Sequence, residues 1–142
     1  MDKNKLKESL NPLLTLIENM MRDNLIASGK GDSNLIKEIQ LTAYIEGDEL
    51  VINDESPEYS VFVDKGRSPG KQPPLQNIIE WCKRKSIPEE FAFPIAKKIG
   101  EEGIPATNYK DPLRNIGTFL DEFISPSIAE DIKNVLKPLN KI

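Results

Sequence analysis

The spacing of apolar residues predicts a long amphipathic helix at the start of the chain. Over residues 2–28, leucine, isoleucine and methionine recur every three or four positions, as they do on one face of a helix. The stripe consists of Leu6, Leu10, Leu13, Leu14, Ile17, Met20, Met21 and Leu25. Pro12 interrupts it, which leaves two interpretations open: a helix kinked at Pro12, or a second helix that Asn11 caps and Pro12 begins.

The period then changes to two, which predicts a β-hairpin. Residues 35–46 alternate between apolar and polar side chains, as in a half-buried strand. Gly47-Asp48 supplies a two-residue hairpin loop, and residues 49–54 return as the partner strand. This register pairs Ala43 with Ile52 on one apolar face. The sequence therefore predicts a hairpin over residues 35–54.

Two short helices are predicted in the middle of the chain. Apolar residues between positions 75 and 82 follow helical spacing. A second helix is predicted over residues 88–102, entered through Ser86 and Glu89 as a capping box. Gly103 is expected to end it.

The last part of the chain is predicted to be extended and then helical. Residues 104–110 are expected to be extended, and helical spacing follows from Asp111 with a break at Ser125-Pro126. The predicted fold class is α+β: an antiparallel sheet built on the 35–54 hairpin, flanked by N- and C-terminal amphipathic helices and short middle helices. A single domain is expected over residues 1–142, with a helical region at 1–34, the sheet and short helices at 35–110, and a helical region at 111–142. The pattern leaves open whether the terminal helices belong to the core or dock onto other proteins.

Charge is unevenly distributed along the chain. The formal net charge is −4, which argues against a protein that works mainly by neutralising phosphates. Residues 65–110 carry nine basic and five acidic side chains, whereas residues 1–64 carry six and thirteen. The middle of the chain is thus the basic part.

The absence of histidine excludes several classes of site. The chain has no histidine and one cysteine, Cys82, so that Ser-His-Asp and Cys-His catalysis and most zinc geometries are ruled out. Magnesium bound by Asp54, Glu55, Glu58 and Asp64 is a weak hypothesis, because no paired donor accompanies them. We therefore expect no enzyme, no cofactor and no metal. A lone cysteine also favours folding in a reducing cytoplasm, and the short apolar runs predict no membrane anchor.

A loop at residues 65–74 combines three cations with five glycine or proline residues. It differs from a phosphate-binding loop, because Pro69 removes a backbone donor and Gln72 stands where serine or threonine is needed. Another basic run ends the helix that follows this loop. Its positive charges there interact favourably with the negative end of the helix dipole. Either basic segment can be a solvated surface or a partner contact. The candidate partner-contact residues are Lys65, Arg67, Lys71, Lys83, Arg84 and Lys85.

Aromatic residues are few and gather in the middle of the chain. Trp81, Phe91, Phe93 and Tyr109 are interpreted as core residues packed between the short helices and the sheet. Cys82 lies on the apolar stripe of its helix and is interpreted as a small core residue.

The order of motifs over residues 35–124 resembles a known family. The stretch Tyr59–Arg67 is followed by Pro73-Pro74, then a helix with Ile79-Glu80-Trp81, then a helix ending at Ile99–Gly103 and the step Ile104-Pro105-Ala106. This order is similar to that of the tail-completion and head-tail-joining (neck) proteins of tailed phages.

The resemblance implies a structural virion protein and no catalytic residues. It would be an α+β subunit assembled in the host cytoplasm into a homo-oligomeric ring between portal and tail tube. Its partners would be the portal, other neck proteins and tail proteins, and genomic DNA would pass through the ring without specific binding. An alternative function is a small nucleic-acid-binding adaptor that uses the six cations named above. A carboxylate-dependent enzyme is a third possibility.

Overall fold

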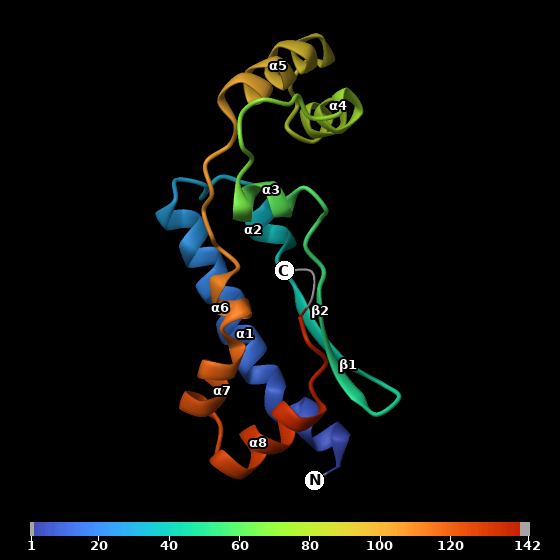
Figure 1. Ribbon diagram of the computed structural model, residues 1–142, viewed down its shortest axis with the longest axis vertical. Coiled ribbons are helices and arrows are strands. Elements are labelled where there is room, and N and C mark those ends of the chain that lie inside the picture. The colour runs from blue at the N-terminus through green and yellow to red at the C-terminus, as the bar shows by residue number, and fades with distance from the viewer. Residues whose placement is uncertain (1, 140–142) are drawn as a thin grey trace. The chain divides into compact units, whose positions relative to one another are not determined.

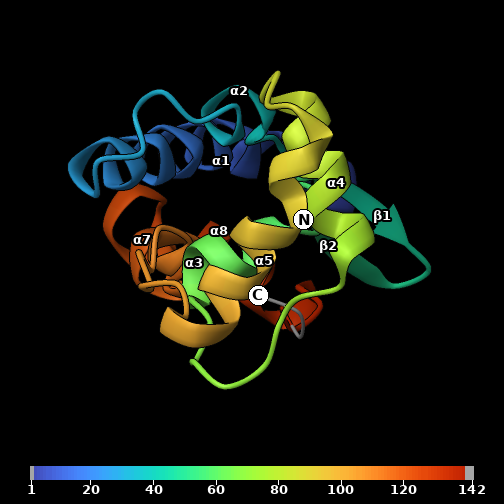
Figure 2. The same cartoon turned by 90° about the horizontal axis from the view of Figure 1, so that it is seen from above.

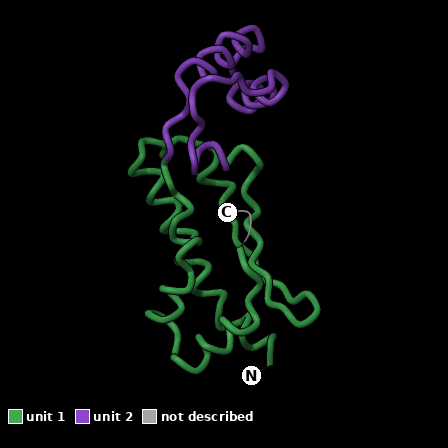
Figure 3. Tube along the Cα trace, viewed as in Figure 1, with its two compact units in different colours: residues 1–60, 107–142 green, residues 61–106 purple. Residues whose placement is uncertain are grey.

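The computed structural model describes residues 2–139 of the 142-residue chain. It divides the chain into two compact units (Figure 3). Unit 1 comprises residues 1–60 and 107–142, and unit 2 comprises residues 61–106. The fold is α+β, as the sequence predicts: within the described residues, helices accompany a two-stranded antiparallel sheet.

Helix α1 (Lys3–Ala27) confirms the first predicted element and removes one of its two interpretations. It is one continuous helix with Pro12 inside it, so Asn11 does not cap a second helix. Pro12 is exposed, and the hydrogen bond that it cannot donate is therefore lost on the solvent side, where water can replace it. Asp2 caps the helix, since its carboxylate accepts the N–H of Asn4 at 2.8 Å.

The strand predicted from residue 35 begins later, at residue 41. Residues 35–38 instead form a short helix, α2 (Leu35–Glu38). Leu35 and Ile39 are both buried, and a spacing of four places them on one helical face, so the apolar pattern fits a helical turn as well as a strand. Arg22 of α1 fixes this turn by donating to the carbonyl of Ile36 at 3.1 Å and to that of Ile39 at 2.8 Å.

The hairpin has the predicted register. Strands β1 (Leu41–Glu46) and β2 (Glu49–Asp54) pair antiparallel, with Ala43 opposite Ile52. The loop is Gly47-Asp48, and Gly47 has φ +61°, a conformation that glycine adopts without strain.

Three helices complete unit 1. They are α6 (Asp111–Arg114), α7 (Ile116–Phe123) and α8 (Pro126–Val135), and the predicted break at Ser125-Pro126 is confirmed. The expected extended stretch before them is only partly extended, because Asn108 has φ +53° and the chain turns at Tyr109. After α8, Leu136 forms a parallel bridge with Leu50 of β2.

The core of unit 1 forms on one face of α1. Helix α1 contacts β1, α6, α7 and α8. Figure 1 shows α7 to the left of α1 and the hairpin to its right, and Figure 2 shows the same elements from above. The terminal helical regions therefore contribute to the core of this unit. Its largest fully buried side chains are Tyr109, Leu6, Leu10, Ile17, Met21, Leu25, Leu35, Ile39, Leu50, Leu113, Leu120 and Ile132.

Unit 2 is helical. Helix α3 (Ser60–Lys65) begins at the boundary, and α4 (Leu75–Arg84), the 3-10 helix η1 (Glu89–Phe91) and α5 (Ala92–Glu102) follow. The predicted capping box is wrong: Ser86 has φ +57° in the turn that ends α4, and Pro88 occupies the position before η1. Gly103 ends α5 as predicted, with φ +75°.

The aromatic residues of the middle region do not form the expected core. Phe91 and Phe93 are 50% and 58% exposed, whereas Tyr109 is buried in unit 1. Cys82 is fully buried, as predicted. Unit 2 packs α4 against α5, and Trp81 is half-buried.

None of the helices within residues 2–139 is both long enough and apolar enough to cross a bilayer.

Candidate partner-binding surface

All six candidate partner-contact residues lie in unit 2, and the loop that carries three of them is held by backbone hydrogen bonds. The N–H of Arg67 donates to the carbonyl of Ile104, and the N–H of Ile104 donates back, both at 2.8 Å. A third bond joins the N–H of Gly70 to the carbonyl of Gly100 at 2.7 Å. The loop is therefore tied to the C-terminal end of α5 and the segment after it.

Two glycines allow this close approach. A Cβ atom on Gly66 (φ +72°) would lie 2.4 Å from the carbonyl oxygen of Ile104. A Cβ atom on Gly103 would lie 2.2 Å from the carbonyl oxygen of Arg67. Both distances are too short for any side chain, and both φ values are in the left-handed region. Gly66 of the loop and Gly103 at the end of α5 are thus both needed for the packing of the loop.

Arg67 is used inside unit 2. Its guanidinium donates to the carbonyl of Lys71 from Nη2 at 3.3 Å and from Nε at 3.4 Å. The same group lies 5.2 Å from the ring centroid of Phe62, in the range of a cation–π contact. Arg67 is therefore a positioning residue of the loop, which sequence patterns alone do not indicate. Lys65 and Lys71 are exposed and remain the cations of the loop that a partner can reach.

The second basic run lies at the C-terminal end of α4. Lys83 and Arg84 form its last turn, and the N–H of Lys85 donates to the carbonyl of Trp81 at 3.0 Å. Cations at this end of a helix favour the helix dipole by about 0.3–1 kcal/mol each. These three residues therefore have a local role in addition to any contact with a partner.

A buried ion pair in unit 1 was not anticipated from the sequence. The ammonium of Lys110 lies 2.8 Å from Oδ2 of Asp54 and donates to Oγ of Ser60 at 2.9 Å. The side chains of Lys110 and Asp54 are only 5% and 10% exposed. The other carboxylate oxygen of Asp54 accepts the N–H of Ser56 at 3.0 Å. No sequence signal marks these residues, because a lysine and an aspartate are far more often exposed.

The buried cluster of Lys110, Asp54 and Ser60 has the features of a contact that stabilises the fold. A serine beside a lysine resembles a nucleophile and its base, but a base must be a neutral amine. Here Lys110 forms a salt bridge with Asp54 in addition to its hydrogen bond to Ser60. Ser60 is 1% exposed, so a substrate has no path to its hydroxyl. The cluster therefore joins the end of β2 to the turn before α6.

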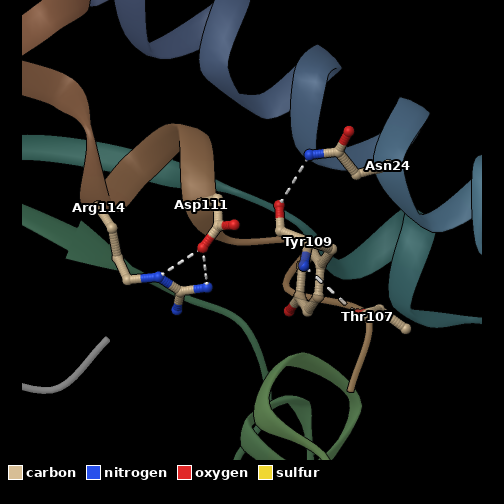
Figure 4. Close-up of polar contacts among 5 residues, drawn as sticks. All are labelled: Asn24, Thr107, Tyr109, Asp111 and Arg114. Atoms are coloured by element: carbon tan, nitrogen blue, oxygen red, sulfur yellow. Dashed lines mark hydrogen bonds and ion pairs between the residues drawn. The ribbon is translucent and has the colours of Figure 1, made fainter. Parts of the chain in front are cut away.

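A second set of polar contacts fixes the same turn (Figure 4). The carbonyl of Tyr109 accepts the side-chain amide of Asn24 at 3.5 Å, and the N–H of Tyr109 donates to the Thr107 hydroxyl at 3.4 Å. In the next turn, Arg114 pairs with Asp111. The turn at residues 107–110 is thus bonded both to α1 and to β2.

The carboxylates suggested as magnesium ligands do not form a cluster. Among residues 2–139, no group of three or more His, Cys, Asp or Glu side chains could hold a metal ion. Asp54 instead binds Lys110.

Comparisons with known proteins give the chain no relatives. No protein-family model, no curated protein and no solved structure matches it.

Proposed function

We propose that this chain is a structural subunit of a tailed-phage neck, of the tail-completion type, which assembles into a ring between portal and tail. The order of motifs over residues 35–124 motivates the family, and the loop of unit 2 supports a role in assembly. The chain would contact copies of itself and the portal, neck and tail proteins next to it, and DNA would pass through without specific binding.

One observation carries the proposal. The basic loop is preorganised, because three backbone hydrogen bonds and two glycine contacts hold it against the end of α5. A rigid loop loses little conformational entropy on binding, so that more of its contact energy appears as affinity. Lys65 and Lys71 are exposed on it, while unit 1 carries eleven basic and seventeen acidic residues. An acidic neighbouring copy is therefore a suitable partner for the loop.

The double variant Lys65→Glu/Lys71→Glu tests this role. We expect the concentration needed for ring assembly to rise at least about tenfold at low salt, because attraction to an acidic neighbour becomes repulsion. The difference should shrink as salt screens exposed charges. Size-exclusion chromatography with light scattering measures the assembly, and immunoblotting of purified virions measures incorporation.

The matched control is Lys5→Glu/Lys37→Glu, which changes net charge equally at two exposed positions of unit 1. It should assemble like the unaltered chain. Equal assembly of the loop variant and the control would contradict the role of the loop. Absence of the chain from virions, together with duplex-DNA binding that weakens steeply with salt, would favour the adaptor function instead.

A further inference from the structure

The apolar side chains that unit 2 buries fully are small, and its larger ones, Phe62 and Trp81 included, are at most half-buried. Its buried apolar residues include Cys82, Ala92 and Ala96, whereas Phe91 and Phe93 are half exposed or more. Unit 1 shows the opposite pattern, with leucine, isoleucine, methionine and tyrosine inside. Small units with few buried apolar atoms have little hydrophobic stabilisation of their own. Exposed phenylalanines on such a unit gain most by being covered by a partner.

One side of α5 combines this exposure with positive charge. Phe93 and Pro94 are exposed in its first turn, and Lys97 and Lys98 are exposed one turn later. A spacing of four places Phe93 beside Lys97 on the helix. The buried residues of α5 are Ala92, Ala96 and Gly100, so these exposed residues form the side away from the core of unit 2. We call Phe93, Pro94, Lys97 and Lys98 the cationic aromatic face.

Helix α7 of unit 1 offers a surface of opposite charge. Phe123 is 60% exposed, and its ring stacks on that of Phe119 with 6.3 Å between centroids. Glu122 is exposed and lies three residues after Phe119, on the same side of the helix. We call Phe119, Glu122 and Phe123 the acidic aromatic face. Among the described residues, Phe123 and Phe93 are the two most exposed large apolar side chains. Phe123 directly follows Asp121-Glu122, and Phe93 has Lys97 one turn later.

We propose that the cationic aromatic face docks onto the acidic aromatic face of a second copy of this chain. This proposal rests on the proposed ring assembly and adds a contact to the one assigned to the loop, since both would join unit 2 of one copy to unit 1 of the next. Phe93 would pack on the Phe119–Phe123 pair, since aromatic rings favour offset and edge-to-face contacts, and Lys97 would pair with Glu122. The two faces differ, so the contact is heterologous, and each bound copy still offers one free face of each kind. Such a contact propagates until the ring closes.

The charges favour a protein over a nucleic acid as the occupant. Unit 2 has eight basic and six acidic residues. Four of these acids flank the cationic aromatic face, because Glu89-Glu90 precede α5 and Glu101-Glu102 end it. Acidic neighbours repel phosphates, whereas they leave the contact between Lys97 and a single carboxylate possible. The excess of acids in unit 1 supplies that carboxylate on every copy.

Two complementary variants test the contact. The donor variant, Phe93→Ala/Lys97→Glu, removes the cationic aromatic face, and the acceptor variant, Glu122→Gln/Phe123→Ala, removes the acidic one. Each alone should raise the dissociation constant of the contact at least about thirtyfold and remain monomeric. An equimolar mixture should form a one-to-one dimer and nothing larger, because one intact face of each kind is left. Native mass spectrometry and light scattering measure these states.

The control variant is Ile26→Ala/Lys30→Glu, which also changes an apolar residue and a lysine spaced by four. Ile26 is 56% exposed and Lys30 is exposed, and both lie outside the two faces, so the control should assemble like the unaltered chain. Circular dichroism establishes that each variant is folded, and the single change Lys98→Glu gives a second, milder test of the donor face.

Three outcomes separate the possibilities. Monomers of the unaltered chain at all concentrations would contradict the proposed ring itself. Rings from the unaltered chain and equally from the donor and acceptor variants would overturn the docking contact alone. Loss of duplex-DNA binding by the donor variant, with assembly unchanged, would assign the face to nucleic acid and overturn the proposal.

Discussion

Replacement of Lys110 by methionine is expected to lower the free energy of unfolding by about 3–5 kcal/mol, because it leaves the Asp54 carboxylate buried without its counter-ion. The two side chains are 5% and 10% exposed and lie 2.8 Å apart. The hydroxyl of Ser60 also loses its donor. Chemical denaturation monitored by circular dichroism measures the loss, which should persist at high salt because buried pairs are poorly screened.

The comparison that isolates the buried charge is the double variant Asp54→Asn/Lys110→Met. Asparagine still accepts the N–H of Ser56 but carries no charge, so that most of the lost stability should return. The matched control is Lys133→Met, which breaks the pair of Lys133 with Asp121, whose side chains are 35% and 64% exposed. It should cost less than about 1 kcal/mol. Equal losses in the free energy of unfolding for Lys110→Met and Lys133→Met would show that burial of the Lys110–Asp54 pair does not affect stability.

Replacement of Gly103 by alanine is the second large effect that we expect. Gly103 has φ +75° and ψ −169°, a region confined almost entirely to glycine that costs an alanine about 1–3 kcal/mol, and the added Cβ would lie 2.2 Å from the carbonyl oxygen of Arg67. That oxygen accepts the N–H of Ile104 at 2.8 Å, so relief of the clash must break the bond. The total loss should be at least about 2 kcal/mol. Native-state hydrogen exchange should show faster exchange at the Ile104 amide.

Gly47→Ala is the control for the conformational part of this cost. Gly47 has φ +61° in the hairpin loop, and nothing lies within 4 Å of the Cβ it would gain. Only the backbone penalty of about 1–2 kcal/mol then applies. A Gly103 variant that lost no more stability than the Gly47 variant would mean that the loop moves freely away from α5.

Elements with a local cause were predictable from the sequence. The register of β1 and β2 follows from a two-residue loop and a period of two, and the break at Ser125-Pro126 follows from the geometry of proline. Residues 35–40 were predicted wrongly because Leu35 and Ile39 share a face in a helix as well as in a strand. A short apolar pattern does not distinguish the two.

Features with a long-range cause could not be predicted. The pair of Lys110 with Asp54 depends on how the turn before α6 meets the end of β2, and neither residue differs in type from an ordinary surface residue. The six candidate cations were identified by composition, which gave no indication that Arg67 is bound to the carbonyl of Lys71. Phe93 was expected inside because apolar residues usually are, but the buried residues of α5 are Ala92, Ala96 and Gly100, and Phe93 is exposed.

The insertion of unit 2 within unit 1 determines the order in which the chain can fold as it leaves the ribosome. Contacts within unit 2 join residues 61–106 and are available once that stretch has emerged. Unit 1 instead joins Asn24 to Tyr109 and Leu50 to Leu136. Closing such long loops costs entropy before any contact is gained, which slows folding. The hairpin can cover part of the apolar stripe of α1 early, but the part that α6, α7 and α8 contact stays uncovered until nearly the whole chain has been made. A chain stopped before α6 therefore presents that part to chaperones and to other nascent chains.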